Sequence, residues 1–378
     1  MEMCHRITIV LQDMVERDEK LKWVLGKCIA DAEWTPPGWE QPISNLDDFY
    51  LYLNQLMETT PVESTFSNLF HGLYFIISQQ ENVLQKEDRF AGFQQWLVLF
   101  TEQYGSFMNS AKSANNLYSF THDKTFEMDL FEVPPGGYNS FNTFFCRHIR
   151  PGKRPIGTRT HAFDPPAEGR PIGASPVEDV NLIHERMCDD TVVTMPADSV
   201  YKGCWAIDEQ DKITVSKGNT YSVETLLSGS RYGDKFKGGL FTHSYLTVFT
   251  YHRYHVPVRG RVLETGVISG DVYADVYQSP DGDLHAKDGT GYQFRQDRGL
   301  LVLDSPIGLV ALLPIGMDVI SSCNITVDPG DYVNKGDEFG YFLFGGSDMI
   351  VIFENRSVDI VLPEVDKLYK LGQVFARV

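Results

Sequence analysis

The apolar residues of this chain change their spacing part-way along, and this change limits the folds that it can adopt. From residue 7 to about 120 they recur at intervals of three and four residues, as on one face of a helix. After a polar connector from Gly152 to Arg186 they form short runs separated by Gly, Pro and Asp, which is typical of strands joined by turns. We therefore expect an α+β protein, with a helical N-terminal region followed by a mainly β, sandwich-like or barrel-like domain.

Local signals place several elements within this frame. Ser44-Asn-Leu-Asp47 has the form of a capping box and predicts the start of a helix, and residues 69–77 and 93–107 predict two more. Residues 115–138, with Pro134-Pro-Gly-Gly137, predict a linker, so the domains are expected at 1–137 and 138–378. Strands are expected at five apolar runs: residues 213–215, 246–251, 261–263, 300–303 and 309–313.

Composition narrows the classes of function. The 378 residues are 42% hydrophobic, enough to bury a substantial core. The net charge of −18 argues against nucleic-acid binding, which depends on Lys and Arg, and weighs against an anionic membrane surface without excluding it. The six cysteines form no Cys-x-x-Cys pair, so neither a disulfide framework nor a metal site is expected. Because no secretory signal and no run of about 18 apolar residues is found, the chain is expected in the cytoplasm.

The stretch from Tyr341 to Phe353 allows two interpretations. Two strand-like runs, 341–344 and 349–353, flank a break of two glycines, a serine and an aspartate. The first interpretation is a hairpin turn, since glycine-containing turns commonly join strands. The second is chemical: beside a glycine, the hydroxyl of Ser347 can attack the Gly346 carbonyl carbon if a base removes its proton. The amide would become an ester, and elimination and hydrolysis would leave a pyruvoyl group at position 347.

Two further motifs could supply the base and its partner. His252-Arg-Tyr-His255 places two imidazoles three residues apart, and Met195-Pro-Ala-Asp198 ends in a carboxylate. Alone, each is more often structural. In this order with Phe-Gly-Gly-Ser347, however, they resemble the phosphatidylserine decarboxylase family, whose members cleave themselves to make a pyruvoyl cofactor. Further matches lie at residues 141–147, 151–156, 217–222 and 308–316, so that the resemblance covers about residues 138–378.

This resemblance implies a role for each site residue. Ser347 would be the self-cleaving residue, and Gly346 would lie on the other side of the cleaved bond. Asp198 and His255 would activate the serine, with Asp198 holding the imidazole in one tautomer. His252 would assist decarboxylation.

The resemblance also implies a two-chain enzyme made from one precursor. A β chain of residues 1–346 and an α chain of residues 347–378 would stay together through strand pairing. The amine of the substrate would form a Schiff base with the pyruvoyl ketone, and no metal or pyridoxal phosphate would be needed.

One residue departs from the family pattern. The family usually has Thr or Ser after the cleaved serine, and this chain has Asp348. Asp348 and Gly345, which flank the cleavage site, are candidate substrate contacts, and Asp348 could bind a substrate ammonium. The alternative is that Asp348 is a solvated turn residue, because acidic side chains are mostly exposed.

The substrate is open between two chemical classes. The N-terminal helical region resembles that of a family subset that includes soluble L-tryptophan decarboxylases, which favours a free aromatic L-amino acid, tryptophan first. The alternative is phosphatidylserine, with phosphatidylethanolamine as the product. A basic cluster could then bind the phosphate, consisting of Arg147, Arg150, Lys153 and Arg154. A non-catalytic relative is a third class, and the sequence leaves the oligomeric state open.

Overall fold

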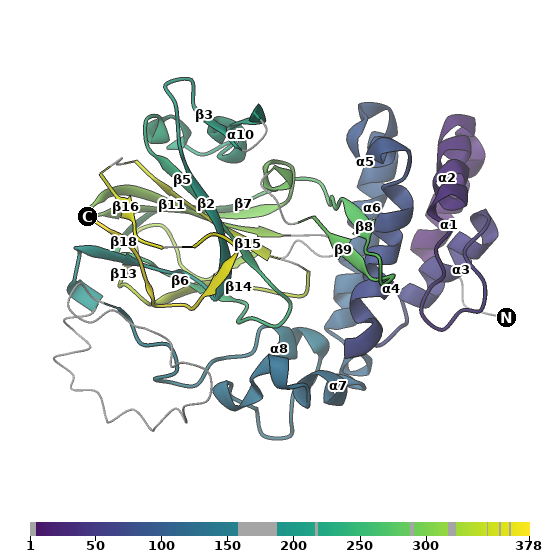
Figure 1. The fold of residues 1–378 in the computed structure, drawn as a ribbon, viewed down its shortest axis with the longest axis horizontal. Coiled ribbons are helices and arrows are strands. Elements are labelled where there is room, and N and C mark those ends of the chain that lie inside the picture. The colour runs from purple at the N-terminus through teal and green to yellow at the C-terminus, as the bar shows by residue number, and fades with distance from the viewer. Residues whose placement is uncertain are drawn as a thin grey trace.

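Helices and strands gather in two parts of the molecule. The computed structural model describes residues 5–157, 187–215, 218–287, 291–316, 323–345, 347–354, 357–362 and 364–378. The longer helices stand together on one side, the sheets lie on the other, and α7 and α8 lie below them (Figure 1). The expected α+β class is confirmed, and the described strands form mostly antiparallel sheets without a closed barrel.

The helical part follows the periodicity of the sequence. Its helices are α1 (Arg6–Arg17), α2 (Glu19–Ala32), α3 (Leu46–Leu56), α4 (Glu63–Ile77), α5 (Val83–Lys86), α6 (Ala91–Met108), α7 (Leu117–Thr121) and α8 (Phe141–Phe145). The helices expected at residues 69–77 and 93–107 are confirmed within α4 and α6. Residues 115–138 contain α7 and short 3₁₀ turns, so the expected plain linker is wrong. No described helix is both long and apolar enough to cross a membrane.

The start of α3 lies one residue later than the capping box predicted. Asn45 is the N-cap, and its side-chain oxygen accepts a hydrogen bond from the backbone N–H of Asp48 at 3.0 Å. The carboxylate of Asp48 in turn accepts from the backbone N–H of Ser44 at 3.1 Å. The Asn45 side chain thus satisfies a first-turn amide that lacks a backbone partner, while Asp48 holds the residue before the N-cap.

The β part is built around an eight-stranded sheet of order β13-β7-β10-β11-β15-β5-β2-β17. Two three-stranded sheets, β1-β18-β16 and β12-β14-β6, and two hairpins, β3-β4 and β8-β9, complete it, and helix α10 (Val223–Leu226) lies between β4 and β5. The strands are β1 (Val192–Thr194), β2 (Ser199–Ala206), β3 (Lys212–Thr214), β4 (Thr220–Ser222), β5 (Leu240–Leu246), β6 (Arg253–His255), β7 (Gly260–Ile268), β8 (Val276–Gln278), β9 (Leu284–Ala286), β10 (Arg298–Ser305), β11 (Gly308–Gly316), β12 (Cys323–Ile325), β13 (Tyr332–Val333), β14 (Glu338–Phe342), β15 (Ser347–Phe353), β16 (Asp359–Ile360), β17 (Lys367–Tyr369) and β18 (Val374–Arg377).

Three of the five expected strand runs lie within strands, the run at 213–215 lies in β3 except for Val215, and the run at 246–251 has only Leu246 in a strand. Strand β5 ends at Leu246, and the chain then turns, with the backbone N–H of Thr250 donating to the Thr247 carbonyl at 3.1 Å. The hydroxyl of Thr250 donates to the same carbonyl at 2.7 Å. Such local side-chain bonds compete with strand pairing, which explains why an apolar run became a turn.

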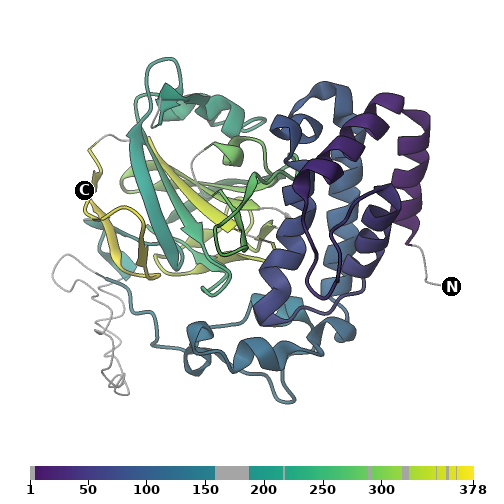
Figure 2. The ribbon, with the colours of Figure 1, turned by 45° about the vertical axis from the view of Figure 1, so that its right-hand side comes forward.

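The sheet is covered on both faces. Met349, Val351 and Phe353 of β15 belong to a large core that extends into the helical part, whereas Ile350 and Ile352 face a second core beneath α10. This alternation is that of a strand buried on both sides. The β8-β9 hairpin packs against α4 of the helical part (Figure 2). There Asn68 of α4 donates to Asp283 and accepts from the N–H of Leu284, each at 2.8 Å.

Candidate active site

The segment Gly345–Ser347 joins two different sheets. Strand β14, before it, pairs with β12 and β6, whereas β15, after it, pairs with β11 and β5. The hairpin interpretation is therefore wrong. Ser347 lies opposite Gly316 of β11 and Leu246 of β5, while Gly346 and the side chain of Ser347 lie outside the described residues. Gly345 has φ of 131°, a backbone angle that a residue with a Cβ rarely adopts.

Aromatic rings fix the chain just before this crossing. Phe344 lies 4.8 Å from Phe66 and 5.5 Å from Phe70, both on α4, between ring centroids. Helix α8 also contacts it through Phe141 and Phe145. The backbone N–H of Phe344 donates to the side-chain oxygen of Asn142 at 2.9 Å. The N-terminal helices, in which the sequence showed no catalytic motif, thus pack against Phe344, two residues before Gly346.

His252 is buried, and among the described residues the backbones of Phe145 and Thr247 come near its ring as polar groups, acting to raise its pKa. Its side chain is 0% exposed, and among the described residues neither ring nitrogen makes a hydrogen bond. Phe145 stacks on the ring at 3.7 Å between centroids and 22° between planes. Burial and the nearby Arg147 charge hold the pKa of His252 well below its usual range, so the ring is neutral at neutral pH. The backbone carbonyl of His252 accepts from the N–H of Phe342 at 2.9 Å. Because Phe342 is the last residue of β14, His252 lies beside the end of that strand.

His255, three residues on, is oriented by two hydrogen bonds. Its Nδ1 lies 2.8 Å from the Gly336 carbonyl oxygen, and its Nε2 lies 3.1 Å from the hydroxyl of Tyr251. A carbonyl can only accept, so Nδ1 must carry the proton and Nε2 must accept from Tyr251. Burial lowers the pKa of His255. The result is a neutral imidazole whose Nε2 lone pair can act as a base.

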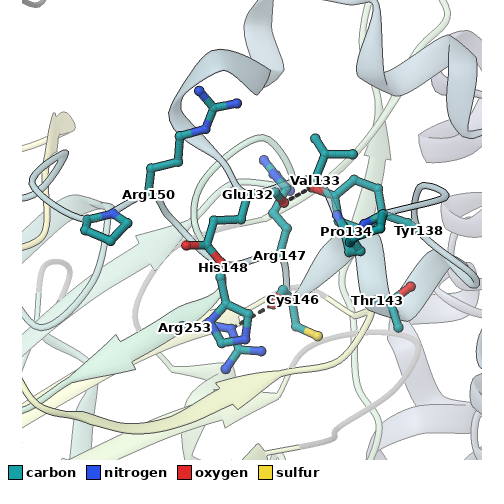
Figure 3. A pocket seen from close by; sticks show the side chains of 12 residues that line it. Glu132, Val133, Pro134, Tyr138, Thr143, Cys146, Arg147, His148, Arg150 and Arg253 are labelled. Carbon is teal, nitrogen blue, oxygen red and sulfur yellow. Dashed lines mark hydrogen bonds between the residues drawn. The ribbon is translucent and has the colours of Figure 1, made fainter. Parts of the chain in front are cut away.

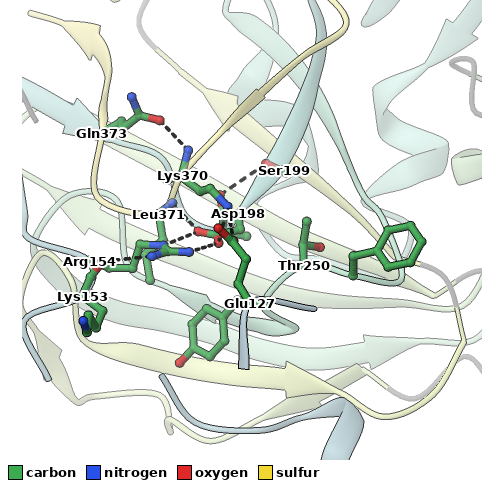
Figure 4. Close-up of polar contacts among 12 residues, drawn as sticks. Glu127, Lys153, Arg154, Asp198, Ser199, Thr250, Lys370, Leu371 and Gln373 are labelled. Carbon is green, nitrogen blue, oxygen red and sulfur yellow. Dashed lines mark hydrogen bonds and ion pairs between the residues drawn. The ribbon is translucent and has the colours of Figure 1, made fainter. Parts of the chain in front are cut away.

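Asp198 is held by an arginine rather than by a histidine (Figure 4). Arg154 donates to both carboxylate oxygens, from Nε at 2.8 Å and from Nη2 at 2.5 Å, and the N–H of Leu371 donates at 2.8 Å. The Nζ of Lys370 lies 3.6 Å away. Burial acts to raise the pKa of Asp198, but the hydrogen bonds and charge of Arg154 outweigh it and hold that pKa below its usual range.

The expected hydrogen bond between Asp198 and His255 is therefore not formed. The segment that ends at Asp198 does run beside His255, since the N–H of His255 donates to the Pro196 carbonyl at 2.8 Å. The charge of Asp198 also acts to raise the pKa of both histidines. Asp198 is thus close enough to act on the histidines electrostatically, while the Gly336 carbonyl takes the orienting position expected for the carboxylate.

Comparison with known proteins gives a family match over the second half of the chain. The family model described as phosphatidylserine decarboxylase matches residues 184–377, a range that includes Asp198, both histidines and Ser347. The chain belongs to the phosphatidylserine decarboxylase family. The match begins after the helices, so the family assignment rests on the β part.

Relatives of this chain within the phosphatidylserine decarboxylase family are named for different substrates. Phosphatidylserine decarboxylase proenzyme 2 of Oryza sativa is 30% identical over 71% of this chain and 38% of its own length. The phosphatidylserine decarboxylase proenzyme of Fusobacterium nucleatum is 28% identical, over 69% of this chain and 75% of its own. An L-tryptophan decarboxylase of Psilocybe cubensis is 29% identical over 60% of this chain and 48% of its own length. The matches thus span less than half of the rice and Psilocybe cubensis proteins.

Asp348, where this family member departs from the usual pattern, is not a solvated turn residue. It is the second residue of β15 and is 0% exposed. Its carboxylate lies against His243 of β5 and Gln293, two residues that the sequence did not single out. Both carboxylate oxygens of Asp348 face those two side chains. The expected direct contact between Asp348 and the substrate is not tested by this structure and stays a prediction.

The basic cluster splits apart in the structure. Arg154 is paired with Asp198, as described above, whereas Arg147 and Arg150 line a cleft of about 790 Å³ (Figure 3). Arg147 is 1% exposed, and its guanidinium lies 4.1 Å from the ring centre of Phe131 and donates to the Phe249 carbonyl. Burial lowers the pKa of Arg147 to about 10. The remaining lining residues include His148, Arg253 and Glu132.

Sequence reasoning missed residues that hold Asp198 and His255 in place, and for one of them a sequence motif could have indicated the role. Arg154 lies in Pro151-Gly-Lys-Arg-Pro-Ile156, which had been recognised as a family match but was interpreted only as part of a basic patch. Gly336, which orients His255 through its carbonyl, carries no side chain that could have indicated this role.

Proposed function

We propose that the chain is the precursor of a pyruvoyl-dependent decarboxylase, which cleaves itself between Gly346 and Ser347 and then releases CO₂ from an amino acid. One observation carries the proposal. The segment Gly345–Ser347 crosses between two sheets at the end of β14, where His252 is fully buried with no hydrogen-bond partner among the described residues. Buried polar atoms are nearly always satisfied, and exceptions commonly mark functional sites.

The residues around the crossing fit a pyruvoyl group at position 347. The unsatisfied ring nitrogens of His252 are available to a reacting group, and the neutral ring can exchange a proton with it. When present, a pyruvoyl group supplies a carbonyl that accepts the electrons left behind as a carboxylate departs as CO₂. The Nε2 lone pair of His255 is proposed to take the Ser347 hydroxyl proton during maturation, and His252 to handle the proton of turnover.

Maturation should yield two chains from the purified protein. We expect one chain of residues 1–346 and one of residues 347–378, the second with a blocked, pyruvoyl N-terminus. Denaturing mass spectrometry measures both masses directly. A protein that stays full length and yet releases CO₂ from a substrate would contradict the pyruvoyl mechanism, because the carbonyl forms only on cleavage.

We propose a free aromatic L-amino acid, tryptophan first, as the substrate. Relatives named L-tryptophan decarboxylase, in Psilocybe cubensis and Psilocybe cyanescens, support this class. The charge of −18 supports it as well, because each basic residue near an anionic membrane contributes about 1 kcal/mol and this chain has an excess of acids. The resulting enzyme would be cytoplasmic.

A specific observation favours phosphatidylserine as a second candidate. Three arginines, Arg147, Arg150 and Arg253, line the cleft; Arg147 is buried and Arg253 is paired with Glu338 at 2.6 Å, so the exposed Arg150 is the guanidinium that faces a ligand. Arginine is well suited to bind phosphate oxygens. Val133, at the same cleft, is 53% exposed and could contact an acyl chain. The relatives named phosphatidylserine decarboxylase proenzyme support the same alternative.

The substrate assay should separate these candidates. We expect CO₂ release from tryptophan or another free aromatic amino acid in buffer without detergent, and no sedimentation with vesicles that contain phosphatidylserine. The matched variant is Arg150→Gln, which removes an exposed cleft charge and should leave turnover of the free amino acid unchanged. Turnover of phosphatidylserine in mixed micelles that falls in Arg150→Gln, with free amino acids inert, would favour the lipid instead.

A further inference from the structure

Three polar side chains form a buried cluster beside the candidate cleavage site. Asp348 Oδ1 lies 3.1 Å from Nε2 of His243, and the side-chain amide of Gln293 donates to Asp348 Oδ2 at 3.3 Å. The same amide lies 2.9 Å from Nε2 of His243. All three side chains are 0% exposed. They come from separate parts of the chain: β15, β5 and the 3₁₀ turn Tyr292–Phe294.

The surroundings of this cluster are apolar. Neighbouring positions on the same face of the sheet, Phe241 of β5 and Ile350 of β15, belong to the core beneath α10, and Phe294 of the 3₁₀ turn joins them. Removing a carboxylate from water in such surroundings is costly unless it is hydrogen-bonded. The remaining residues of β15, from Met349 to Phe353, are apolar. The strand therefore carries its one buried charge at the end next to residue 347.

The position of that charge matters once the chain is cut. After cleavage, residue 347 would be a chain terminus, and covalent connection through Gly346 would no longer hold it. Strand ends fray, because a terminal residue is fixed by few contacts. The partners of Asp348, His243 and Gln293, both lie within residues 1–346, so the contacts cross from one proposed chain to the other.

We propose that the His243–Gln293–Asp348 cluster is a clamp that holds the first residues of the cleaved chain, so that the carbonyl at position 347 stays aligned with the substrate. This inference rests on the proposed function. The three residues are positioning residues, since they act on the reacting group through the backbone of β15. The departure from the usual Thr or Ser at position 348 then has a structural purpose.

The test compares three variants on the full-length precursor. Asp348→Ala removes the clamp, Asp348→Asn keeps its shape and one of its two acceptor oxygens but removes the charge, and Thr242→Val is the matched control. Thr242 also ties β5 to β15, by donating its hydroxyl to the Val351 carbonyl at 2.9 Å, and is 2% exposed, but it acts four residues away from position 347. The α-chain and pyruvoyl content of each preparation is measured by mass spectrometry, and kcat is expressed per pyruvoyl group.

The expected result is a loss in kcat with little change in KM. A displacement of about 1 Å in a reacting group can cost roughly 10²-fold, and we expect a loss of that order in Asp348→Ala. Asp348→Asn, which keeps one of the two acceptor contacts, should recover part of kcat, and Thr242→Val should stay close to wild type. Gln293→Met, which changes only the larger chain, should lower kcat in the same direction and covers the case in which Asp348→Ala does not fold.

Two results would overturn the clamp. One is wild-type kcat per pyruvoyl group in both Asp348→Ala and Gln293→Met. The other is an equal loss in Thr242→Val, which would show that any weakened contact between β5 and β15 has the same effect. Failure of the proposed function is recognised separately, because the wild-type protein would then lack the cleaved chains and the pyruvoyl mass.

Discussion

Ser347→Ala and His255→Ala should both remain single polypeptides of 378 residues. Ser347→Ala removes the proposed nucleophile, and His255→Ala removes the proposed base, whose unprotonated Nε2 accepts from Tyr251 in this structure. The expected effect is complete loss of cleavage and therefore of decarboxylation. The measurement is denaturing mass spectrometry after prolonged incubation, with wild type in parallel.

Tyr251→Phe is the matched control for this prediction. It removes the hydroxyl that donates to Nε2 of His255 but leaves the bond between Nδ1 and the Gly336 carbonyl, so cleavage should persist. Cleavage of His255→Ala at the wild-type rate would reject His255 as the base.

The same assay tests how Asp198 acts. If Asp198 oriented His255 directly, Asp198→Asn would slow cleavage by about 10⁴-fold, as in hydrolase triads. In the structure the Gly336 carbonyl orients the ring and Asp198 binds Arg154, so we expect a much smaller loss. Arg154→Gln should resemble Asp198→Asn, because both disturb the same buried ion pair. A loss of about 10⁴-fold in Asp198→Asn alone would restore the direct triad.

His252→Phe should cleave and yet lose decarboxylation. Phenylalanine can keep the stacking on Phe145, which lies 3.7 Å from the imidazole, while both ring nitrogens are removed. Positioned proton transfer typically contributes about 10² to 10⁴-fold, and we expect a fall in kcat within that range. Cleavage is measured by mass spectrometry and turnover by CO₂ release, on the same preparation.

His252→Ala separates packing from chemistry in this prediction. It removes the nitrogens and also leaves a cavity beside Phe145, so it should lose turnover and be less stable than His252→Phe. Retained turnover in His252→Phe would show that the imidazole serves only packing. If His252→Phe fails to cleave, His252 rather than His255 would be assigned the maturation role. The strand register is compatible with that outcome, because His252 lies nearer than His255 to the end of β14.

Much of the fold followed from local patterns. The three-to-four spacing of apolar residues predicted α4 and α6, and the short runs at 300–303 and 309–313 predicted parts of β10 and β11. These predictions succeed because helix faces and strand faces depend on residues that are near one another in the chain. The family motifs likewise pointed to the crossing at Ser347 and to the two histidines.

The choice of partners was decided only by the tertiary structure. The sequence around residue 345 allowed a hairpin, but β14 pairs with β12 and β6 and β15 pairs with β11 and β5, rather than with each other. The sequence allowed Asp348 to be solvated, but the sheet buries it against His243. Asp198 could have bound a histidine, yet its carboxylate accepts hydrogen bonds from Arg154, 44 residues earlier in the chain. A residue's type and neighbours determine which bonds it is able to make, whereas the packing of remote segments determines which of those bonds are within reach.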